Sequence, residues 1–463
     1  MYVSKNGSRS ATCGSPEDPC LRIDDVLFNR EGQVIIYLDP GPEKMNRTTI
    51  NNSTPINKKS NKDGRTSTRS FVEMGGYEYE IYLPLNLKAA VSFRSWHPNK
   101  TIRPVITTKH DRMFIIENNQ SFFAQDINFK LMSTSRSAIL LEIDSIGFHL
   151  ENATLKNVEI KSDSECKVIY MKTFQSITNI QVDNVKIYGG SLVAIVGNPK
   201  IDSSVNKKSK TIENLHVTGL MDAKHVVYFE STPSRCRVGK VEILNSTKID
   251  YALFFIQSVC KIDFVLIRDA ESIKHTAIHV TRKRNQKNKE KPNETDKVNG
   301  KFSRDFQEIG RYLSTLPFSK PEDKVSDKGK GLFSIEKVHI ENCTMTTAIE
   351  VSNNKRDFKI NHLVIKNNTM ENTIELTGAH FESNDVFIFN NSIGRNIYQQ
   401  KQGNLKIHQL LIKNNTVKDI SKAIVYQAGE KTTFEFTNAH IEWREIKESH
   451  PPLADIYLGK SFY

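Results

Sequence analysis

The chain has 463 residues, of which 38% are hydrophobic and 25% charged, and its formal net charge is +12. This length and apolar content can bury a large core, either in two or three ordinary domains or in one elongated domain. No run of about 18 apolar residues occurs, so the sequence predicts no membrane-spanning helix. The basic excess is concentrated in residues 42–69 and 282–331, which indicates basic loops and not a uniformly basic surface.

Residues 1–41 form the first predicted unit, an N-terminal cap followed by the first strand. Met1 is followed directly by strand-like residues, so we expect the chain to start as a mature N-terminus. Asp18 is a good helix N-cap, Pro19 suits the first helical position, and Gly32 lies past the expected helix end. The run VIIYLDPG then predicts the first strand of the main sheet, and a basic loop follows at 42–69.

Residues 70–445 contain a repeat of about 24 residues, with longer insertions at 198–210 and 282–331. Each unit carries an apolar stretch such as AIEV or TIEL and a second apolar stretch such as VHIEN or LVIKN. Apolar residues alternate within these stretches, which is typical of strands. Each second stretch closes on a residue that tolerates a left-handed backbone, namely Asn184, Gly219, Asn245, Asp269, Asn342, Asn367, Asn390, Asn414 or Asn438.

This pattern predicts an all-β fold, a parallel β-helix (solenoid) of about a dozen coils. Successive coils stack about 4.8 Å apart, so like residues form ladders. Asn342, Asn367, Asn390 and Asn414 are expected to form an asparagine ladder at one corner. Residues 446–463 are expected to be a C-terminal tail or cap, since an open stack exposes strand edges at both ends.

The opening residues YVSKNGS and CGSPEDPCLRIDDVL resemble the start of secreted right-handed parallel β-helix proteins of the pectate-lyase-like superfamily. The resemblance covers these residues by motif and about 110–445 by repeat pattern. It implies a right-handed β-helix with an N-terminal capping helix. The chain lacks the paired-Asp polygalacturonase motif with a following HG and the R-x-P-x-x-R motif of plant-type lyases. The resemblance therefore implies a fold and no particular activity.

The six cysteines indicate an oxidising compartment. Cys13 and Cys20 flank a short loop that they could close, and Cys236 and Cys260 hold the same phase on adjacent coils. We expect both pairs to be disulfides, although in-phase buried thiols would also explain the second pair. Cys166 and Cys343 lie several coils apart and are expected to be free.

Thirteen N-x-[ST] sequons occur, which favours a secreted or extracellular cell-surface glycoprotein. The alternative is that NNT is simply the turn that this fold prefers. A glycan core is wider than the coil spacing, so we expect partial occupancy at most at the four ladder asparagines. The loop sites Asn46, Asn99 and Asn293 are expected to be used more.

The third residue of each AIEV-like stretch is expected to point outward and form one ladder. Glu350 and Glu375 lie on adjacent coils with His279 before them, which suits acid–base work on a glycosidic bond. If these carboxyls are catalytic, one should have a raised pKa, because its neighbour's charge disfavours a second ionisation. A plain solvated strand face is the alternative. Aromatic residues in the same ladder are candidates for ligand binding: Tyr170, Tyr228, Phe255 and Tyr398.

The sequence favours recognition or adhesion, with an acidic or sulfated glycan or another surface protein as partner. The alternative is a polysaccharide lyase or glycoside hydrolase that uses Glu350, Glu375 and His279. An amphipathic segment at 302–318 is a candidate lid over this ladder. We expect no cofactor, no metal site and no nucleic-acid partner, and the oligomeric state stays open. Changing both Glu residues should spare binding under the first reading and abolish turnover under the second.

Overall fold

A computed structural model describes the chain except for residues 11, 28–32, 42–75, 99–101, 117–120, 136, 145–148, 174–175, 198–209, 233–235, 282–332, 353–356, 418–423, 428–432 and 444–463. Its contacts define one unit made of Met1–Thr281 and Leu332–Tyr463, and a second unit, Arg282–Gly331, which lies outside the described residues. The predictions for the basic loop, the candidate lid, the tail and Asn46, Asn99 and Asn293 also fall outside them.

The described residues are almost entirely β-structure, in one sheet. The first strands are β1 (Tyr2–Ser8), β2 (Gln33–Leu38), β3 (Glu78–Ile81), β4 (Leu85–Leu87), β5 (Ala90–Ser95), β6 (Val105–Thr108), β7 (Arg112–Ile116), β8 (Phe122–Gln125) and β9 (Asn128–Leu131). The middle strands are β10 (Ser137–Asp144), β11 (His149–Ser162), β12 (Glu165–Thr173), β13 (Ser176–Ile187), β14 (Ser191–Val196), β15 (Lys210–Thr218), β16 (His225–Glu230), β17 (Cys236–Leu244) and β18 (Thr247–Ile256). The last strands are β19 (Cys260–Arg268), β20 (Glu271–Thr281), β21 (Phe333–Glu341), β22 (Thr344–Ser352), β23 (Asp357–Lys366), β24 (Thr369–Phe389), β25 (Ser392–Val417), β26 (Ile424–Gln427) and β27 (Thr433–Trp443).

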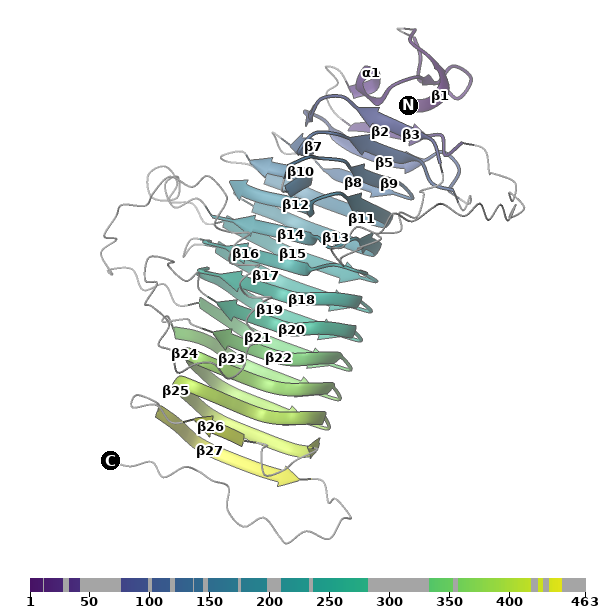
Figure 1. Ribbon diagram of the computed structural model, residues 1–463. Coiled ribbons are helices and arrows are strands. Elements are labelled where there is room, and N and C mark those ends of the chain that lie inside the picture. Colours follow the sequence, from purple (N-terminus) through teal and green to yellow (C-terminus); the bar gives the residue numbers. More distant parts are fainter. Residues whose placement is uncertain are drawn as a thin grey trace, which may run out of the picture. The chain divides into compact units, whose positions relative to one another are not determined.

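Strand pairing is parallel throughout. Near the N-terminus each strand pairs with the third strand on, as β2 does with β5 and β3 with β6, and from β10 to β22 it pairs with the second strand on. The series β11, β13, β15, β17, β19, β21, β23 forms one run of neighbours. The series β10, β12, β14, β16, β18, β20, β22 forms another. Both runs end on β24, which pairs along its length with β25 (Figure 1). The predicted stack of parallel coils is therefore confirmed as an open, solenoid-like sheet.

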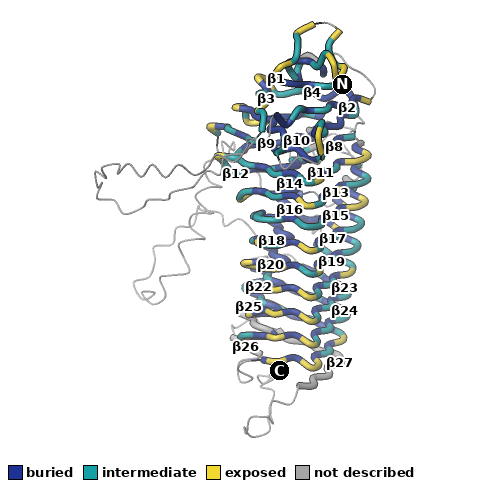
Figure 2. The backbone as a smooth tube through the Cα atoms, turned by 90° about the vertical axis from the view of Figure 1, so that its right-hand side faces the viewer, coloured by how far each residue is buried: buried dark blue, intermediate teal, exposed yellow. Residues whose placement is uncertain are grey.

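The core lies inside the coils, and in many strands buried residues alternate with more exposed ones, as the burial colours of Figure 2 show. Five phenylalanines from successive coils stack there, with ring centroids 4.4–5.6 Å apart: Phe229, Phe255, Phe333, Phe358 and Phe381. Stacked aromatic rings bury large apolar areas at favourable spacing. In this part of the core, phenylalanine therefore packs against phenylalanine from one coil to the next.

The turn asparagines adopt the left-handed backbone that their sequence positions predict. Asn342, Asn367, Asn390 and Asn414 have φ between 54° and 56°, and Asn245 has 48°. This conformation disfavours most L-residues, but asparagine tolerates it. The asparagine corner is therefore confirmed. The left-handed turn that this fold needs at the corner is enough to explain why asparagine occurs at these five sequons.

One short helix, α1 (Ile23–Leu27), lies near the N-terminus, and it starts later than predicted. Asp18 and Pro19 are not its first residues. Ser8 N–H donates to Pro19 O, and Leu21 N–H donates to Ser8 O, both at 2.8 Å. These bonds hold residues 19–21 extended beside β1, so no helical turn forms before Ile23.

The predicted Cys13–Cys20 disulfide is present. Cys236 and Cys260 are direct register partners on β17 and β19, as their phase predicts, but both are free buried thiols. The expected second disulfide is therefore absent. In-register side chains on parallel strands point the same way, so their Cβ atoms stay about 4.8 Å apart. A disulfide needs about 3.5–4.5 Å between Cβ atoms.

Candidate functional site

The predicted catalytic residues lie side by side on three neighbouring strands. His279 of β20 is the register partner of Glu350 of β22, which is in turn the partner of Glu375 of β24. Toward the N-terminal end the same ladder continues through Phe254, Tyr228, Ala194 and Tyr170. We call this series, from Tyr170 to Glu375, the outer ladder.

The Glu350 carboxylate is held by two partners from the preceding coil. Its Oε2 lies 3.0 Å from His279 Nδ1 and accepts a hydrogen bond from Thr276 Oγ1 at 3.0 Å. Burial alone would raise the pKa of Glu350, but the hydrogen bond and charge of His279, with the Thr276 hydroxyl, hold the pKa below its ordinary value of 4.5. A raised pKa, expected of a general acid, is therefore wrong for Glu350.

Aromatic rings extend this polar pair along the outer ladder. Phe254 stacks on the His279 imidazole at 4.8 Å between centroids, with the rings 8° apart, and it faces Tyr228 at 5.9 Å. Tyr228 and Phe254 are only 7% and 6% exposed, and His279 is 1% exposed. Because these rings are already packed on one another, little of their surface is left for a ligand to stack on.

A second set of rings, not predicted from the sequence, lies beside the outer ladder. The rings of His225, Tyr251 and His275 stack at 5.5 Å and 5.1 Å, and Tyr251 also contacts Phe254 and His279. His275 is exposed and Tyr251 is half-buried, so this set reaches solvent. These residues lie three or four positions before the outer-ladder residues, a spacing that strict strand alternation does not reveal.

His225 is buried and lies 2.9 Å from the Ser191 hydroxyl through its Nδ1 atom. Burial lowers the pKa of His225 well below 6.5, and the nearby positive charges of Lys224 and His279 lower it further. His225 is therefore a neutral imidazole near neutral pH. It packs Tyr228, Tyr251 and Phe254 around it.

Two residues predicted to lie on the outer ladder as ligand-binding residues, Phe255 and Tyr398, do not occupy its positions. Phe255 belongs to the core stack and is 1% exposed, and Phe254 takes the outer-ladder position instead. Tyr398 is the register partner of the buried Ile374, whereas Gln399 pairs with Glu375. The register of β25 shifts by one residue after Ile393, which moves Tyr398 out of phase.

The other two predicted ligand-binding residues lie on the outer ladder. Tyr170 is half-buried, with the Lys167 ammonium 4.9 Å from its ring centroid. Tyr228 donates its hydroxyl to Glu230 Oε2 at 2.8 Å. Burial, with the neighbouring Glu230 charge, raises the pKa of Tyr228 well above 10. Of these two side chains, Tyr170 is the more accessible.

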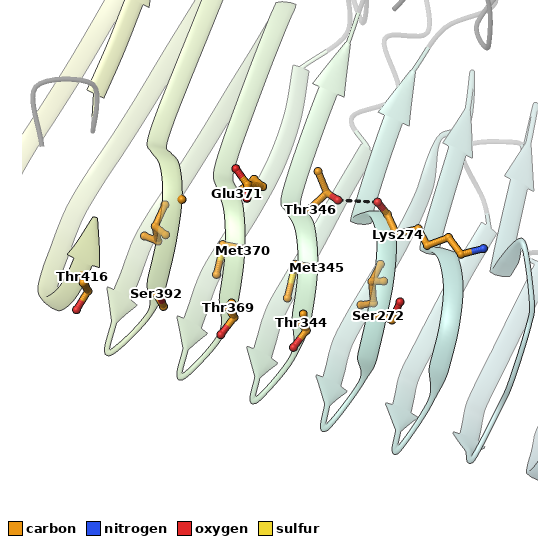
Figure 3. Close-up of a pocket in the computed structure, with 13 residues that line it drawn as sticks. Ser272, Lys274, Thr344, Met345, Thr346, Thr369, Met370, Glu371, Ser392 and Thr416 are labelled. Atoms are coloured by element: carbon orange, nitrogen blue, oxygen red, sulfur yellow. Dashed lines mark hydrogen bonds between the residues drawn. The ribbon is translucent and has the colours of Figure 1, made fainter. Parts of the chain in front are cut away.

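A groove of about 630 Å³ runs across β20, β22, β24 and β25 between the outer ladder and the asparagine corner (Figure 3). Its floor is apolar and comes from Met345, Met370 and Ile393, all buried. Four exposed hydroxyl residues line its edge beside the corner: Thr344, Thr369, Ser392 and Thr416. Each is the third residue of a corner sequon.

The described part of the chain contains no helix with the length and hydropathy needed to cross a bilayer. Within the same ranges, no three His, Cys, Asp or Glu side chains come together as metal ligands would. Comparison of the chain with models of protein families, with curated proteins and with solved structures finds no match. The geometry of the coils and their ladders is thus the basis for any functional proposal.

Proposed function

We propose that this protein is a secreted or cell-surface β-helix glycoprotein that acts in recognition or adhesion. Its partner is an acidic or sulfated glycan, or another surface protein, bound by those side chains of the outer ladder and the neighbouring rings that reach solvent. The observation that carries this proposal is the continuous strip formed by the outer ladder with His225, Tyr251 and His275. Aromatic rings, an imidazole and two carboxylates follow one another along this line of the stack, which suits an extended partner that runs across several coils.

The fold proposal is a right-handed parallel β-helix of about a dozen coils, related to the pectate-lyase-like superfamily, with α1 at its N-terminal cap. Parallel crossovers are right-handed in almost all proteins, because twisted strands pack back onto a sheet most easily that way. The Cys13–Cys20 disulfide supports an oxidising location.

The chemistry of Glu350 favours binding over acid catalysis. Its carboxylate accepts hydrogen bonds from both His279 and Thr276, and its lowered pKa keeps it ionised at neutral pH. A carboxylate held in this way can accept hydrogen bonds from a ligand's hydroxyl or amide groups. A fixed anion with one exposed imidazole and one half-buried phenol nearby is a polar recognition surface.

A polysaccharide lyase or glycoside hydrolase remains the second candidate. It is favoured by one observation: Glu350 and Glu375 lie directly opposite each other on neighbouring strands. Strands in a sheet are about 4.8 Å apart, close to the carboxyl separation of retaining glycosidases. Under this candidate His279 and Glu350 act as a dyad and Glu375 as the second carboxylate.

Binding to a glycan array tests the proposal, with Tyr251→Ala and His275→Ala as variants. Both should weaken binding to any glycan that the wild type retains, because these two rings reach solvent. Tyr37→Ala is the matched control, since Tyr37 is a half-buried aromatic residue at the far N-terminal end of the stack. Equal binding by all three variants would exclude the strip as the recognition surface.

An assay for new reducing ends and unsaturated uronates separates the two candidates. Turnover that is lost in both Glu350→Gln and Glu375→Gln, but kept in Glu382→Gln, would establish the enzyme. Glu382 is a suitable control because it is a carboxylate of β24 paired with Lys359 at 2.9 Å, away from the outer ladder. No turnover with retained binding would support recognition.

A further inference from the structure

Five sequons at the asparagine corner share one geometry. In each, the asparagine is exposed and left-handed, and the middle residue is buried. The hydroxyl residue that follows is exposed in four of the sequons and half-buried at Thr247. The five asparagines are Asn245, Asn342, Asn367, Asn390 and Asn414. Both outer residues of each sequon therefore reach the surface at one sharp turn, with Thr247 the least accessible of the hydroxyl residues.

The side-chain amides at this corner fall into two groups. The amides of Asn157, Asn184 and Asn342 each donate to the corner residue of the preceding coil, at 2.8–3.0 Å. Among the described residues, the amides of Asn367 and Asn390 have no hydrogen-bond partner. The same holds for Asn245 and Asn414. These four amides can be modified without disturbing a hydrogen bond, whereas the nitrogen that would be modified at Asn342 already donates to Asp269.

Space for a substituent lies directly beside two of these amides, those of Asn390 and Asn414. A hollow of about 380 Å³ is lined by Asn390, Asn391, Ser392, Asn414 and Thr416. It borders the larger groove of Figure 3, whose edge carries the sequon hydroxyls. In the described structure the side-chain hydroxyls along this edge have no hydrogen-bond partner. The backbone N–H of each of these residues donates to a carbonyl of the preceding coil. The four residues are Thr344, Thr369, Ser392 and Thr416. They are free to bind a sugar attached at the adjacent asparagine.

Crowding limits how many of these sites can be used together. Asn367, Asn390 and Asn414 lie on successive coils about 4.8 Å apart, closer than two pyranose rings can lie side by side without conflict. Asn245 differs, because the corner residues of its neighbouring coils are Gly219 and Asp269, which carry no sequon.

We propose that the corner carries N-linked glycans, at Asn245 independently and at alternate coils of the Asn367–Asn390–Asn414 series. This proposal rests on the proposed secreted location. The step transfers an oligosaccharide from a lipid diphosphate. The amide nitrogen forms a bond to the anomeric carbon of the first sugar, the bond from that carbon to the diphosphate breaks, and the amide loses a proton. Neighbouring sites compete, since a glycan on one coil occupies the space beside the next.

Glycopeptide mass spectrometry on the full chain, secreted from animal cells, tests this competition directly. Trypsin cuts after Arg395 and, when accessible, after Lys366, so Asn367 and Asn390 fall in one peptide. We expect peptides with one glycan to predominate and peptides with two to be rarer than the product of the two site occupancies. The peptide 241–248 carries Asn245 alone and should be almost fully modified.

The variant Asn390→Gly sharpens the test, because glycine keeps the left-handed turn and removes the competing site. Occupancy at Asn367 and Asn414 should rise in this variant and stay unchanged at Asn245. Joint occupancy of Asn367 and Asn390 equal to the product of the single occupancies would overturn the proposal. So would unmodified Asn245 in a chain that carries glycans at Asn46, Asn99 or Asn293. A secreted chain with no glycan at any site would instead overturn the glycoprotein proposal itself.

Discussion

Asn390 and Asn391 are adjacent in the chain but have different roles. Asn390 faces solvent and supplies the left-handed turn. Asn391 is 2% exposed, and its Oδ1 accepts from Asn368 N–H at 2.9 Å while its Nδ2 donates to Ile365 O at 2.9 Å. Asn368 and Asn415 make equivalent bonds on the coils before and after. A buried asparagine ladder therefore joins the coils from inside the same corner.

Replacing Asn391 by leucine should lower the free energy of unfolding by about 2–6 kcal/mol. The substitution leaves the buried Asn368 N–H and Ile365 O without partners, and each unpaired buried group costs about 1–3 kcal/mol. Urea denaturation followed by circular dichroism measures the change. Asn390→Gly is the control, since it alters only the exposed neighbour, and equal losses in both variants would contradict the role of the buried amide.

The burial of His225 predicts acid sensitivity. Its pKa is lowered in the folded state, so below its ordinary value of 6.5 the unfolded chain binds more protons than the folded chain. Stability should therefore fall as pH drops below 6.5, by up to about 1.4 kcal/mol per pH unit. The lowered pKa of Glu350 adds a separate loss only below about pH 4.5.

Urea denaturation at pH 7.5 and at pH 5.5 measures this effect. The wild type should lose more stability between these values than His225→Gln, which keeps a polar group beside Ser191 but does not titrate in this range. A similar loss in both proteins would show that a group other than His225 carries the acid response.

At the scale of the strands, the sequence predicts the elements better than it predicts their exact phase. The left-handed turns and the alternation of apolar residues were enough to place His279, Glu350 and Glu375 in one ladder. The segment between corner and ladder varies in length, because Lys248 and Ser272 adopt left-handed bulge conformations. Aligning the sequence on a repeat of fixed length does not detect such one-residue insertions.

The same variation explains what the sequence missed at the site. β20 carries one more residue than β18 between the corner and the ladder, and the extra residue lies beside His275. The ring set His225, Tyr251 and His275 depends on this local geometry. The second asparagine of each NNT turn was also overlooked, since a polar residue inside the core is not predicted by apolar alternation.

The aromatic core stack predicts that Phe255 matters for stability and not for recognition. Its ring lies 4.5 Å from Phe229 and 4.4 Å from Phe333. Phe255→Ala should cost about 3–5 kcal/mol, as large-to-small changes of buried aromatics do. Thermal denaturation checks this value against Phe123→Ala, where the ring is half-buried beside Arg94. A loss no larger than that of the control would place Phe255 outside the core.

At the scale of the whole molecule, each coil contacts mainly the coils before and after it, as β22 pairs with β20 and β24. The free energy of unfolding is then close to the sum of each coil's own stability and of the interaction energies between neighbouring coils. Removing one complete coil should therefore leave a shorter but intact stack.

Deletion of residues 368–390 tests this prediction. It removes all of β24 and joins Asn367 to Asn391, so the turn sequence and the ladder phases are preserved. The variant should keep a β-type circular dichroism spectrum and one melting transition. Deletion of 368–379 removes only half of the coil, puts the remainder out of phase and should prevent folding of the stack's C-terminal part. Equal behaviour of the two deletions would contradict the modular description.

The connections between strands differ sharply in length from one corner to another. β19 ends at Arg268 and β20 begins at Glu271, and β21 and β22 are joined as tightly, whereas β14 ends at Val196 and β15 begins only at Lys210. β20 and β21 are further apart still, ending at Thr281 and beginning at Phe333. Extra sequence thus enters after the ladder-bearing strands and is excluded from the asparagine corner. For protein engineering, the ends of β14 and β20 are the points at which a foreign epitope can be spliced into the stack with every ladder kept in phase.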